Sequence, residues 1–464
     1  MIQSRAVRCA APLWCLVAFL AGCPAGAPLA DSSAADLGPI KPPFVQRLTN
    51  DSDPSTTQVK MNLVQWNWAR QIAADDSGAV HVVWVQLGSV DINPPADHPD
   101  PVDTHALPTG QIYTSRSRDR GTTWSTPRAL TTRAAGTDSA GVVTSAGHVY
   151  VLWRASDGDR LRAFLRASAD RGESFGAAVP VSDNPSGVSV SPPALAASPS
   201  PPGAVYTVWA DGRVQQVLGQ SVTIKEVYLA RSADHGATWT AASPVSVPDG
   251  FSSWTPAVAA WAGTLHVAWT DERDDTGECT KGSNSCREEE YYRRSLDGGK
   301  SWQAELRLTS DAPGAPKESW APSLAVWGNS VHVAYLDRRT GLFRNYYRRS
   351  LDGGQSFLPE VELTADPAFD QAARPHLAVR GQAVHLVWFG FTDFDADIYY
   401  SRSLDDGARW SSPLDLTAAT AAVGAARMPH VAVAPDGAAH VVWYDSRHSD
   451  GAGPRIELYY ARLD

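Results

Sequence analysis

The sequence is poor in cysteine and methionine, has no excess of basic residues, and carries no long apolar run beyond its first residues. Of 464 residues, 5 are Cys and 3 are Met, and 40 Lys and Arg stand against 50 Asp and Glu, a formal net charge of −10. This acidic balance argues against nucleic acid as a partner. The sequence also lacks a Gly-rich phosphate loop, a G-x-S-x-G nucleophile elbow and a metal motif with recognisable spacing, so we expect no cofactor and no metal.

The first 22 residues have the pattern of a secretory signal. Arg5 and Arg8 precede the apolar segment Leu13 to Ala21, which is too short to span a membrane. The segment ends in Leu-Ala-Gly-Cys at Cys23, which resembles the bacterial lipobox, where cleavage precedes the Cys and the Cys carries lipid. We therefore expect a lipoprotein signal peptide over 1–22, a lipidated Cys23 at the start of a flexible tether over 23–43, and export to the cell envelope, at the outer membrane or cell surface. The alternative is an ordinary signal peptide in which Cys23 is incidental.

Two cysteines, Cys279 and Cys286, lie beyond this leader. They stand seven residues apart in the polar stretch "ECTKGSNSCREEE", where an oxidising compartment favours a local disulfide. A zinc site is disfavoured, because no further Cys remains and no His lies in the stretch.

Repetition is the main feature of the remaining chain. The pattern S-x-D-x-G-x-x-W/F, called the box below, occurs six times, beginning at Ser117, Ser168, Ser232, Ser295, Ser350 and Ser403. In a hairpin turn, Gly supplies a backbone angle that other residues avoid, Asp and Ser satisfy turn N–H groups, and the aromatic ring is buried between sheets. The box is therefore predicted to fold the chain and not to catalyse.

Short β-branched and aromatic segments precede the boxes at regular spacing, which predicts an all-β array. Seven segments similar to "VHVVW" (80–84) occur, the last at 440–443, and units of about 60 residues are typical of a β-propeller. We predict one domain over 44–464, with seven four-stranded antiparallel blades. The last unit stops after its third strand, and "FVQRLT" (44–49) resembles the missing fourth, so the N-terminal strand is predicted to complete the last blade and close the ring.

The boxes and their strands resemble the Asp-box (BNR repeat) propellers of the sialidase superfamily, here in a bacterial lipoprotein form. The resemblance covers 44–464. It implies a sialidase-like fold and, for part of the family, retaining hydrolysis of sialosides by a Tyr nucleophile. No arginine-isoleucine-proline motif occurs near residues 42–70, and all 14 Tyr lie in or beside repeated strands. The family also contains non-enzymatic assembly and receptor propellers.

Residues that recur in every unit are expected to serve the scaffold, whereas a site needs an asymmetric set. Trp68, Trp254 and Trp320 align where units enter their first strand, with Arg427 at the corresponding place in the last unit and Arg374 near it in the sixth. These are the candidate substrate-binding residues, because aromatic faces stack on sugars and arginines hold carboxylates. The alternative is that the Trp residues plug the central channel.

Glu318, with Asp271 or Asp337, is the candidate pair for proton transfer. Glu318 is not repeated, and its alternative is a solvated surface charge. Asp271 and Asp337 belong to a recurrent W/Y-x-D-x-R pattern, and their alternative is a structural ion pair. We expect a monomer that binds a glycan or glycoconjugate in the funnel of its top face. Glycoside hydrolysis is one implication, and a non-catalytic scaffold for an envelope protein is the other.

Overall fold

The computed structural model describes residues 40, 43–49, 70–87, 110–132, 136–217, 220–274, 288–310, 318–365, 370–391, 396–418, 426–446 and 456–464. Strands and turns, and no helices, make up these ranges. A helix able to cross a membrane is accordingly absent from the described part of the chain. Cys23, Trp68, Cys279 and Cys286 lie outside the described residues, so the lipidation site, the disulfide and one of the aligned Trp residues stay predictions.

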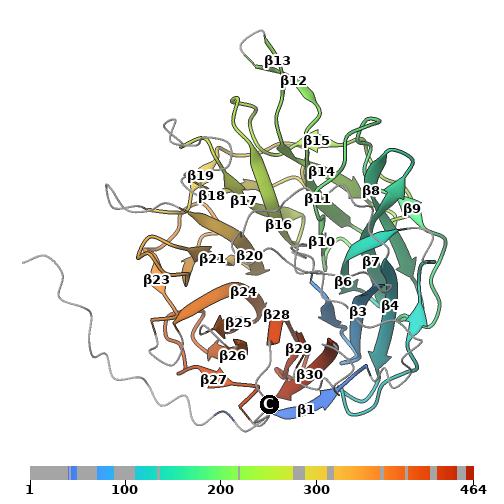
Figure 1. Ribbon diagram of the computed structural model, residues 1–464, viewed down its shortest axis with the longest axis vertical. Coiled ribbons are helices and arrows are strands. Elements are labelled where there is room, and N and C mark those ends of the chain that lie inside the picture. Colours follow the sequence, from blue (N-terminus) through green and yellow to red (C-terminus); the bar gives the residue numbers. More distant parts are fainter. Residues whose placement is uncertain are drawn as a thin grey trace, which may run out of the picture.

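Antiparallel sheets radiate from a central axis in a β-propeller arrangement (Figure 1). One eight-stranded sheet consists of two four-stranded halves joined by the single backbone pair Gly110 and Thr137. Its strands are β2 (Ile72–Ala74), β3 (Val80–Leu87), β4 (Gly110–Ser117), β5 (Arg128–Ala129), β6 (Thr137–Ser145), β7 (His148–Asp157), β8 (Arg160–Ser168) and β9 (Val179–Pro180).

Five further sheets have four strands each, and one separate hairpin has two. The first sheet contains β10 (Ala194–Ala197), β11 (Val205–Asp211), β14 (Glu226–Ser232) and β15 (Ser243–Pro244), and the hairpin contains β12 (Val214–Val217) and β13 (Gln220–Thr223). The next sheets are β16 (Ser253–Trp261), β17 (Thr264–Asp271), β18 (Glu289–Ser295) and β19 (Leu306–Arg307), then β20 (Ser319–Trp327), β21 (Ser330–Asp337), β22 (Arg344–Ser350) and β23 (Val361–Glu362). They are followed by β24 (Gln371–Arg380), β25 (Ala383–Phe391), β26 (Ala396–Ser403) and β27 (Leu414–Asp415), and by β28 (Ala426–Val433), β29 (Ala439–Asp445), β30 (Glu457–Leu463) and β1 (Phe44–Arg47).

The N-terminal strand β1 pairs with the C-terminal strand β30, with Phe44 opposite Arg462 and Arg47 opposite Tyr459. Just beyond β1, the Leu458 N–H donates to Thr49 Oγ1 at 2.9 Å. Six other third strands make the same bond to a Ser or Thr that follows their own fourth strand. The donor and acceptor residues are Ile112 and Thr131, Ala163 and Ser182, Val227 and Ser246, Glu290 and Thr309, Asn345 and Thr364, and Ile398 and Thr417. The N-terminal segment therefore makes the contacts of a fourth strand.

Each box forms the turn between the third and fourth strands of its unit. In the box at Ser295, the Ser Oγ donates to Asp297 Oδ1 at 2.8 Å and accepts the Gly299 N–H at 2.8 Å. The other five boxes repeat both bonds at 2.7–2.8 Å. Hydrogen bonds from the Thr123 hydroxyl and amide hold the pKa of Asp119 at about 2. The boxes are thus locked by their own side chains, in line with a folding role.

Aromatic rings and histidines fill the space between neighbouring sheets. The strand-two tryptophans Trp209, Trp269 and Trp388 are fully buried. In four consecutive units a strand-two His Nδ1 lies 2.6–2.7 Å from a Tyr Oη of strand three: His266 and Tyr292, His332 and Tyr347, His385 and Tyr400, and His440 and Tyr460. These pairs recur and therefore belong to the scaffold.

Replacing one of these histidines should change how stability responds to acid. Burial holds the pKa of His385 at about 4, below its ordinary value near 6.5. Between pH 6.5 and pH 4, the imidazole of His385 is therefore protonated in the unfolded chain but not in the folded protein. The stability that depends on neutral His385 is complete above pH 6.5 and is lost as the pH falls toward 4. Between pH 7 and pH 4.5, His385→Asn should lose roughly 2 kcal/mol less unfolding free energy than the parent protein. Urea unfolding at both pH values measures this difference.

Glu226 provides a control of opposite sign. Burial raises its pKa to about 7, so its contribution is present below its ordinary pKa and is lost as the pH rises through 7. Glu226→Gln should therefore lose less stability than the parent when the pH is raised from 5 to 8. Equal pH slopes for the parent and both variants would contradict this assignment.

Candidate functional site: a basic cavity on the axis

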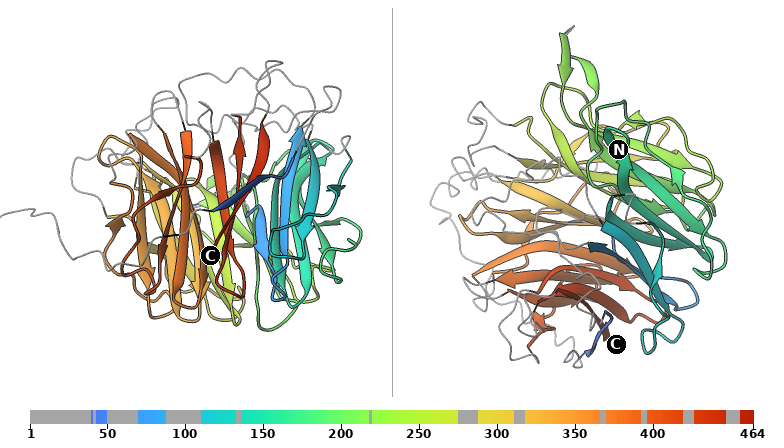
Figure 2. Two further views of the ribbon diagram at one scale, coloured as in Figure 1. Left: turned by 90° about the horizontal axis from the view of Figure 1, so that it is seen from below. Right: turned by 45° about the vertical axis from the view of Figure 1, so that its right-hand side comes forward.

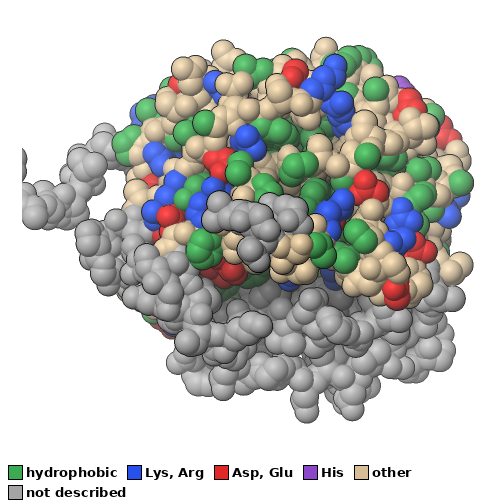
Figure 3. All heavy atoms as spheres, turned by 90° about the horizontal axis from the view of Figure 1, so that it is seen from above, with side chains coloured by type: hydrophobic (Ala, Val, Ile, Leu, Met, Phe, Trp, Pro, Cys, Tyr) green, Lys and Arg blue, Asp and Glu red, His purple; other side chains and the backbone are tan. Residues whose placement is uncertain are grey.

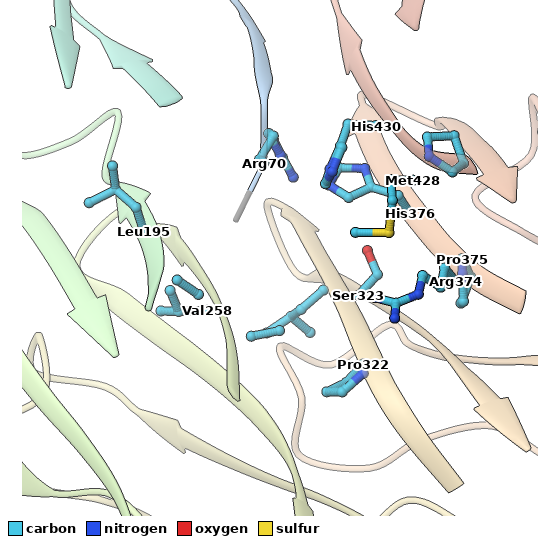
Figure 4. Close-up of a pocket in the computed structure, with 14 residues that line it drawn as sticks. Arg70, Leu195, Val258, Pro322, Ser323, Arg374, Pro375, His376, Met428 and His430 are labelled. Carbon is cyan, nitrogen blue, oxygen red and sulfur yellow. The ribbon is translucent and has the colours of Figure 1, made fainter. Parts of the chain in front are cut away.

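A cavity lies where the inner strands of several sheets approach one another (Figure 4). It encloses about 630 Å³ that protein atoms do not fill, part of it open to solvent. Its polar lining consists of Arg70, Ser323, Arg374, His376 and His430, and among its apolar neighbours are Leu195, Val258 and Met428. The polar groups come from the segment before β2 and from strands β20, β24 and β28, which are far apart in the sequence.

A β-bulge near the start of the inner strands aims these side chains. The pairing register of β24 with β25 shifts between Ala373 and His376, and Arg374 within the shift has a φ of 55°. The same shift occurs in β6, β16, β20 and β28, where Ser139, Thr255, Ala321 and Met428 take the corresponding positive φ. Positive φ costs a residue with a Cβ on the order of 1 kcal/mol. Strain is therefore repeated around the cavity, and bulges of this kind re-aim side chains.

The residue two positions after the residue of positive φ makes the cavity asymmetric. It is small in three units, as Gly141, Ala257 and Ser323, but it is His376 in β24 and His430 in β28. The two imidazole rings meet edge to face with their centroids 4.8 Å apart. Because these histidines break the repeat, they are not needed by every unit and are candidates for a site.

Hydrogen bonds link these side chains to the inner edges of neighbouring strands. The Val431 N–H donates to His376 Nδ1 at 3.3 Å, so the neutral ring carries its proton on Nε2. Arg70 Nη2 donates to the Leu377 carbonyl at 3.4 Å, a long bond between units far apart in the chain. His430 is 4% exposed, and neither of its ring nitrogens has a hydrogen-bond partner among the described residues. A buried polar group of this kind calls for an explanation.

The electrostatics of the cavity are those of a site for an anion. Burial lowers the pKa of Arg70 to about 10, and burial, with the charge of Arg427, lowers that of Arg374. Burial, followed by the charges of Arg70 and Arg374, holds the pKa of His430 at about 3. No Asp or Glu is among the described residues that line the cavity. Each cation is therefore destabilised by its surroundings, and a bound anion would relieve that cost.

The structure separates the predicted substrate-binding residues into two groups. Arg374 lines the cavity, and Arg427 lies close enough to lower its pKa, with its guanidinium 5.8 Å from the centre of the Phe389 ring. Trp254 is partly buried and Trp320 is 8% exposed, and neither lines the cavity. Trp320 instead packs edge to face on Phe343 at 5.5 Å. Neither of these two Trp residues is therefore part of the wall of this cavity.

The candidate carboxylates Asp271 and Asp337 occupy buried ion pairs. Asp271 accepts Arg273 Nε at 2.8 Å and Nη2 at 2.7 Å, and its Oδ2 also accepts the Trp269 indole N–H and the Ser253 hydroxyl. Asp337 Oδ1 accepts the Arg339 backbone N–H at 2.7 Å, and its Oδ2 accepts Arg339 Nη2 and the Ser319 hydroxyl. Every oxygen of Asp271 and Asp337 already accepts hydrogen bonds, as expected of a structural pair.

Glu318 does not line the cavity, and it directly precedes Ser319, whose hydroxyl donates to Asp337. It forms an isolated backbone bridge with Glu288, and its carboxylate lies 3.4 Å from Arg338 Nη1. Its side chain is 12% exposed. The structure therefore does not bring Glu318 together with Arg374, Asp271 or Asp337 at the cavity wall.

Three cavity residues, Arg70, His376 and His430, were not among the predicted site residues. A signal for them existed in the repeats. The first strands read "TPAVA", "APSLA", "RPHLA" and "MPHVA", so His replaces a small residue twice, and the aligned strand of the first unit reads "ARQIA", with Arg70 in place of Pro. The substitutions were visible, but their convergence on one axis was not.

No protein-family model and no curated protein sequence matches the chain. Among solved structures, an ulvan lyase of polysaccharide lyase family PL25 is 10% identical, over 87% of this chain and 93% of that chain, with a TM-score of 0.53. A protein of unknown function from Dyadobacter fermentans is 12% identical over 90% and 99% of the chains, with a TM-score of 0.48. A leech intramolecular trans-sialidase is 12% identical over 70% and 67%, with a TM-score of 0.45. At these identities, the ulvan lyase match shows a shared fold.

Proposed function

We propose that the chain is an Asp-box propeller of seven blades that binds an acidic glycan in its axial cavity and is anchored to the cell envelope through a lipid on Cys23. One observation carries the binding proposal. Arg70, Arg374, His376 and His430 line the cavity together, and no described carboxylate lines it with them. An anionic ligand would offset the cost of holding the two arginines in this buried position.

Seven blades follow if the eight-stranded sheet is counted as two. The single pair at Gly110 and Thr137 supports that division. The bond from Leu458 to Thr49, repeated in six other units, supports β1 as the fourth strand of the last blade. Ring closure through β1 is the arrangement that these contacts favour.

The ligand class follows from the geometry of the donors. Guanidinium groups present paired N–H donors that match a carboxylate or a sulfate, and His376 Nε2 adds a single N–H donor. Leu195, Val258 and Met428 provide apolar surface for the C–H faces of a sugar ring. The ulvan lyase of similar fold has also been solved with bound -[GlcA(1-4)Rha3S]-, a saccharide of this acidic class, although this parallel is only at the level of the fold.

The proposed activity is binding. We assign Asp271 and Asp337 to the scaffold, because their oxygens are already used by Arg273 and Arg339. Glu318 lies outside the cavity wall and beside Arg338, so we assign it no step at the bound glycan.

Calorimetric titration of the mature chain with uronide, sialoside, sulfated and neutral oligosaccharides tests the proposal. We expect acidic sugars to bind and neutral sugars of equal length not to bind, with an affinity that falls as salt is added. Arg427→Gln should weaken binding, since Arg427 adds to the positive potential at Arg374. Glu318→Gln, outside the cavity wall, should leave binding unchanged. Equal binding of neutral sugars, or no binding by any acidic sugar, would refute the proposed ligand class.

A protein-binding scaffold is the second candidate, and the β12–β13 hairpin favours it. This hairpin stands away from the blades (Figures 1 and 2), pairs only within itself among the described strands, and exposes 67% of Val214. The side of the protein near it mixes basic, acidic and apolar side chains without a field of one charge (Figure 3). A photo-crosslinker at position 214 in intact cells should give a discrete protein adduct if this candidate is correct, and none if the chain serves only to bind glycan.

A further inference from the structure

One exposed position at which the boxes differ is the residue between Ser and Asp. In three consecutive units this residue is a leucine: Leu296, Leu351 and Leu404 are 57%, 51% and 45% exposed. The other three boxes carry Arg118, Ala169 and Ala233 at that position. The leucines make no turn contact that Ala cannot make, because the turn is held by the Ser, Asp and Gly of each box. They therefore form an apolar arc on one half of the face that carries the box turns.

Partly buried tryptophans extend this arc toward the axis. Trp261 and Trp327 end strands β16 and β20, at the same end of the sheets as the box turns. Their rings lie 4.6 Å apart, and the guanidinium of Arg380, at the end of β24, lies 5.3 Å from the centre of the Trp327 ring. Trp combines a large apolar face with a polar N–H, which suits the boundary between apolar and aqueous surroundings.

The N-terminal strand begins on the same face. Phe44 pairs with Arg462 near the end of β30, and Arg402 Nη1, on the strand leading to the box at Ser403, donates to the Asp464 carbonyl at 3.4 Å. Phe44 is 54% exposed and Val45 is 37% exposed. The chain therefore enters the fold beside the unit of Leu404, at one end of the arc.

We infer that this arc, from Leu296 through Leu351 and Leu404 to Phe44, is a membrane-facing surface that seats the propeller on a lipid bilayer. The inference rests on the proposed lipidation of Cys23. Residues 24–43, a stretch of 20 residues, separate Cys23 from Phe44. Ile40 already packs against the core, which leaves residues 24–39 for the proposed tether. A flexible chain of 16 residues would span about 22 Å on average and would keep this face within reach of the membrane. Exposed leucines and partly buried tryptophans then enter the interfacial layer.

A protein seated on its arc would turn the mouth of the cavity away from the membrane. The box turns and the starts of the inner strands lie at opposite ends of the sheets, because the inner strands run from the bulges toward the face of Trp261 and Trp327. With the arc on the bilayer, the mouth beside Arg374 points away from the membrane, toward ligands in solution.

Hydroxyl-radical footprinting of the lipidated mature protein on phosphatidylcholine vesicles tests the inference. The reference is the unlipidated chain 24–464 in buffer. We expect the oxidation of Leu296, Leu351 and Leu404 to fall on vesicles, while that of Leu342, 42% exposed in the loop between β21 and β22 at the opposite end of the sheets, stays unchanged. Leu351→Asp should restore oxidation of Leu296 and Leu404, and Ala233→Asp, at the same box position, should not.

Unchanged oxidation of the three leucines on vesicles would overturn the inference, as would equal protection of Leu342. If the leucines are protected in buffer, and the protection grows with protein concentration, then a second copy of the chain covers the arc and the membrane does not. The intact mass of the protein tests the lipid anchor separately, since a Cys23 without an acyl group would show that the anchoring proposal is wrong. In that case the chain is coupled to a maleimide lipid through Cys23, and the same footprint on vesicles tests whether the arc faces the membrane.

Discussion

Replacing Arg70 with methionine is expected to abolish most of the affinity for acidic ligands and, at the same time, to stabilise the unliganded fold. Burial lowers the pKa of the Arg70 guanidinium to about 10, so its surroundings disfavour the charge. Exchange of a buried charge for an apolar chain of similar length should raise the unfolding free energy by about 1–2 kcal/mol. Loss of one charged donor should weaken binding of an acidic oligosaccharide roughly 10- to 100-fold.

Denaturant unfolding and calorimetry on the same preparation measure the two effects. The matched control is Arg380→Met, because Arg380 lies at the other end of β24, over Trp327 and away from the cavity. It should leave affinity for acidic ligands unchanged. If Arg70→Met instead destabilises the unliganded protein by more than about 1 kcal/mol, the charge of Arg70 is already compensated within the fold. That result would contradict the proposal that the cavity binds an anion.

Gly354→Ala is expected to be far more damaging than Gly353→Ala, although both glycines lie in one box. Their φ values are 80° and 70°, so both substitutions meet a backbone cost on the order of 1 kcal/mol. A Cβ on Gly353 would meet nothing closer than Arg294 Nη1 at 3.6 Å, whereas a Cβ on Gly354 would lie 1.8 Å from Tyr292 Oη. Tyr292 is buried in the neighbouring sheet and bonded to His266, so it has no room to withdraw.

We expect a loss of about 1 kcal/mol for Gly353→Ala and about 3–5 kcal/mol for Gly354→Ala in denaturant unfolding. Tyr292→Phe removes the nearest atom of the clash, so the double variant should lose less than the sum of the two single losses. Equal losses for the two glycines would show that only the backbone angle matters. That outcome would remove the packing argument for the box Gly.

The repeated units could be predicted because their causes are local. A Ser, an Asp and a Gly at fixed spacing close the turn with their own hydrogen bonds, as in the box at Ser295. The alternating apolar strands and the Trp and Tyr residues recur at a regular spacing along the sequence, so the repeat of the units can be found without the structure. Arg374 and Arg427 could be selected for a related reason, because each departs from a repeat at the entry to a first strand.

Other features depended on the packing of whole sheets. The pattern around Asp271 and Asp337 left both a functional and a structural role open, and the bonds to Arg273 and Arg339 favour the structural one. Glu318 was distinctive in the sequence but lies away from the cavity wall. A carboxylate's role depends on the groups that surround it, which the order of residues alone does not state.

The sequence by itself therefore determined the all-β repeat, its turns and the departures from them, because hydrogen bonds within a turn and the period of a strand are properties of short segments. Tertiary structure decided the candidate site. Arg70, Arg374, His376 and His430 converge only when distant sheets are arranged around one axis, and their lowered pKa values arise from the burial that this convergence creates. Charge, burial and distance across the axis are properties of the assembled fold.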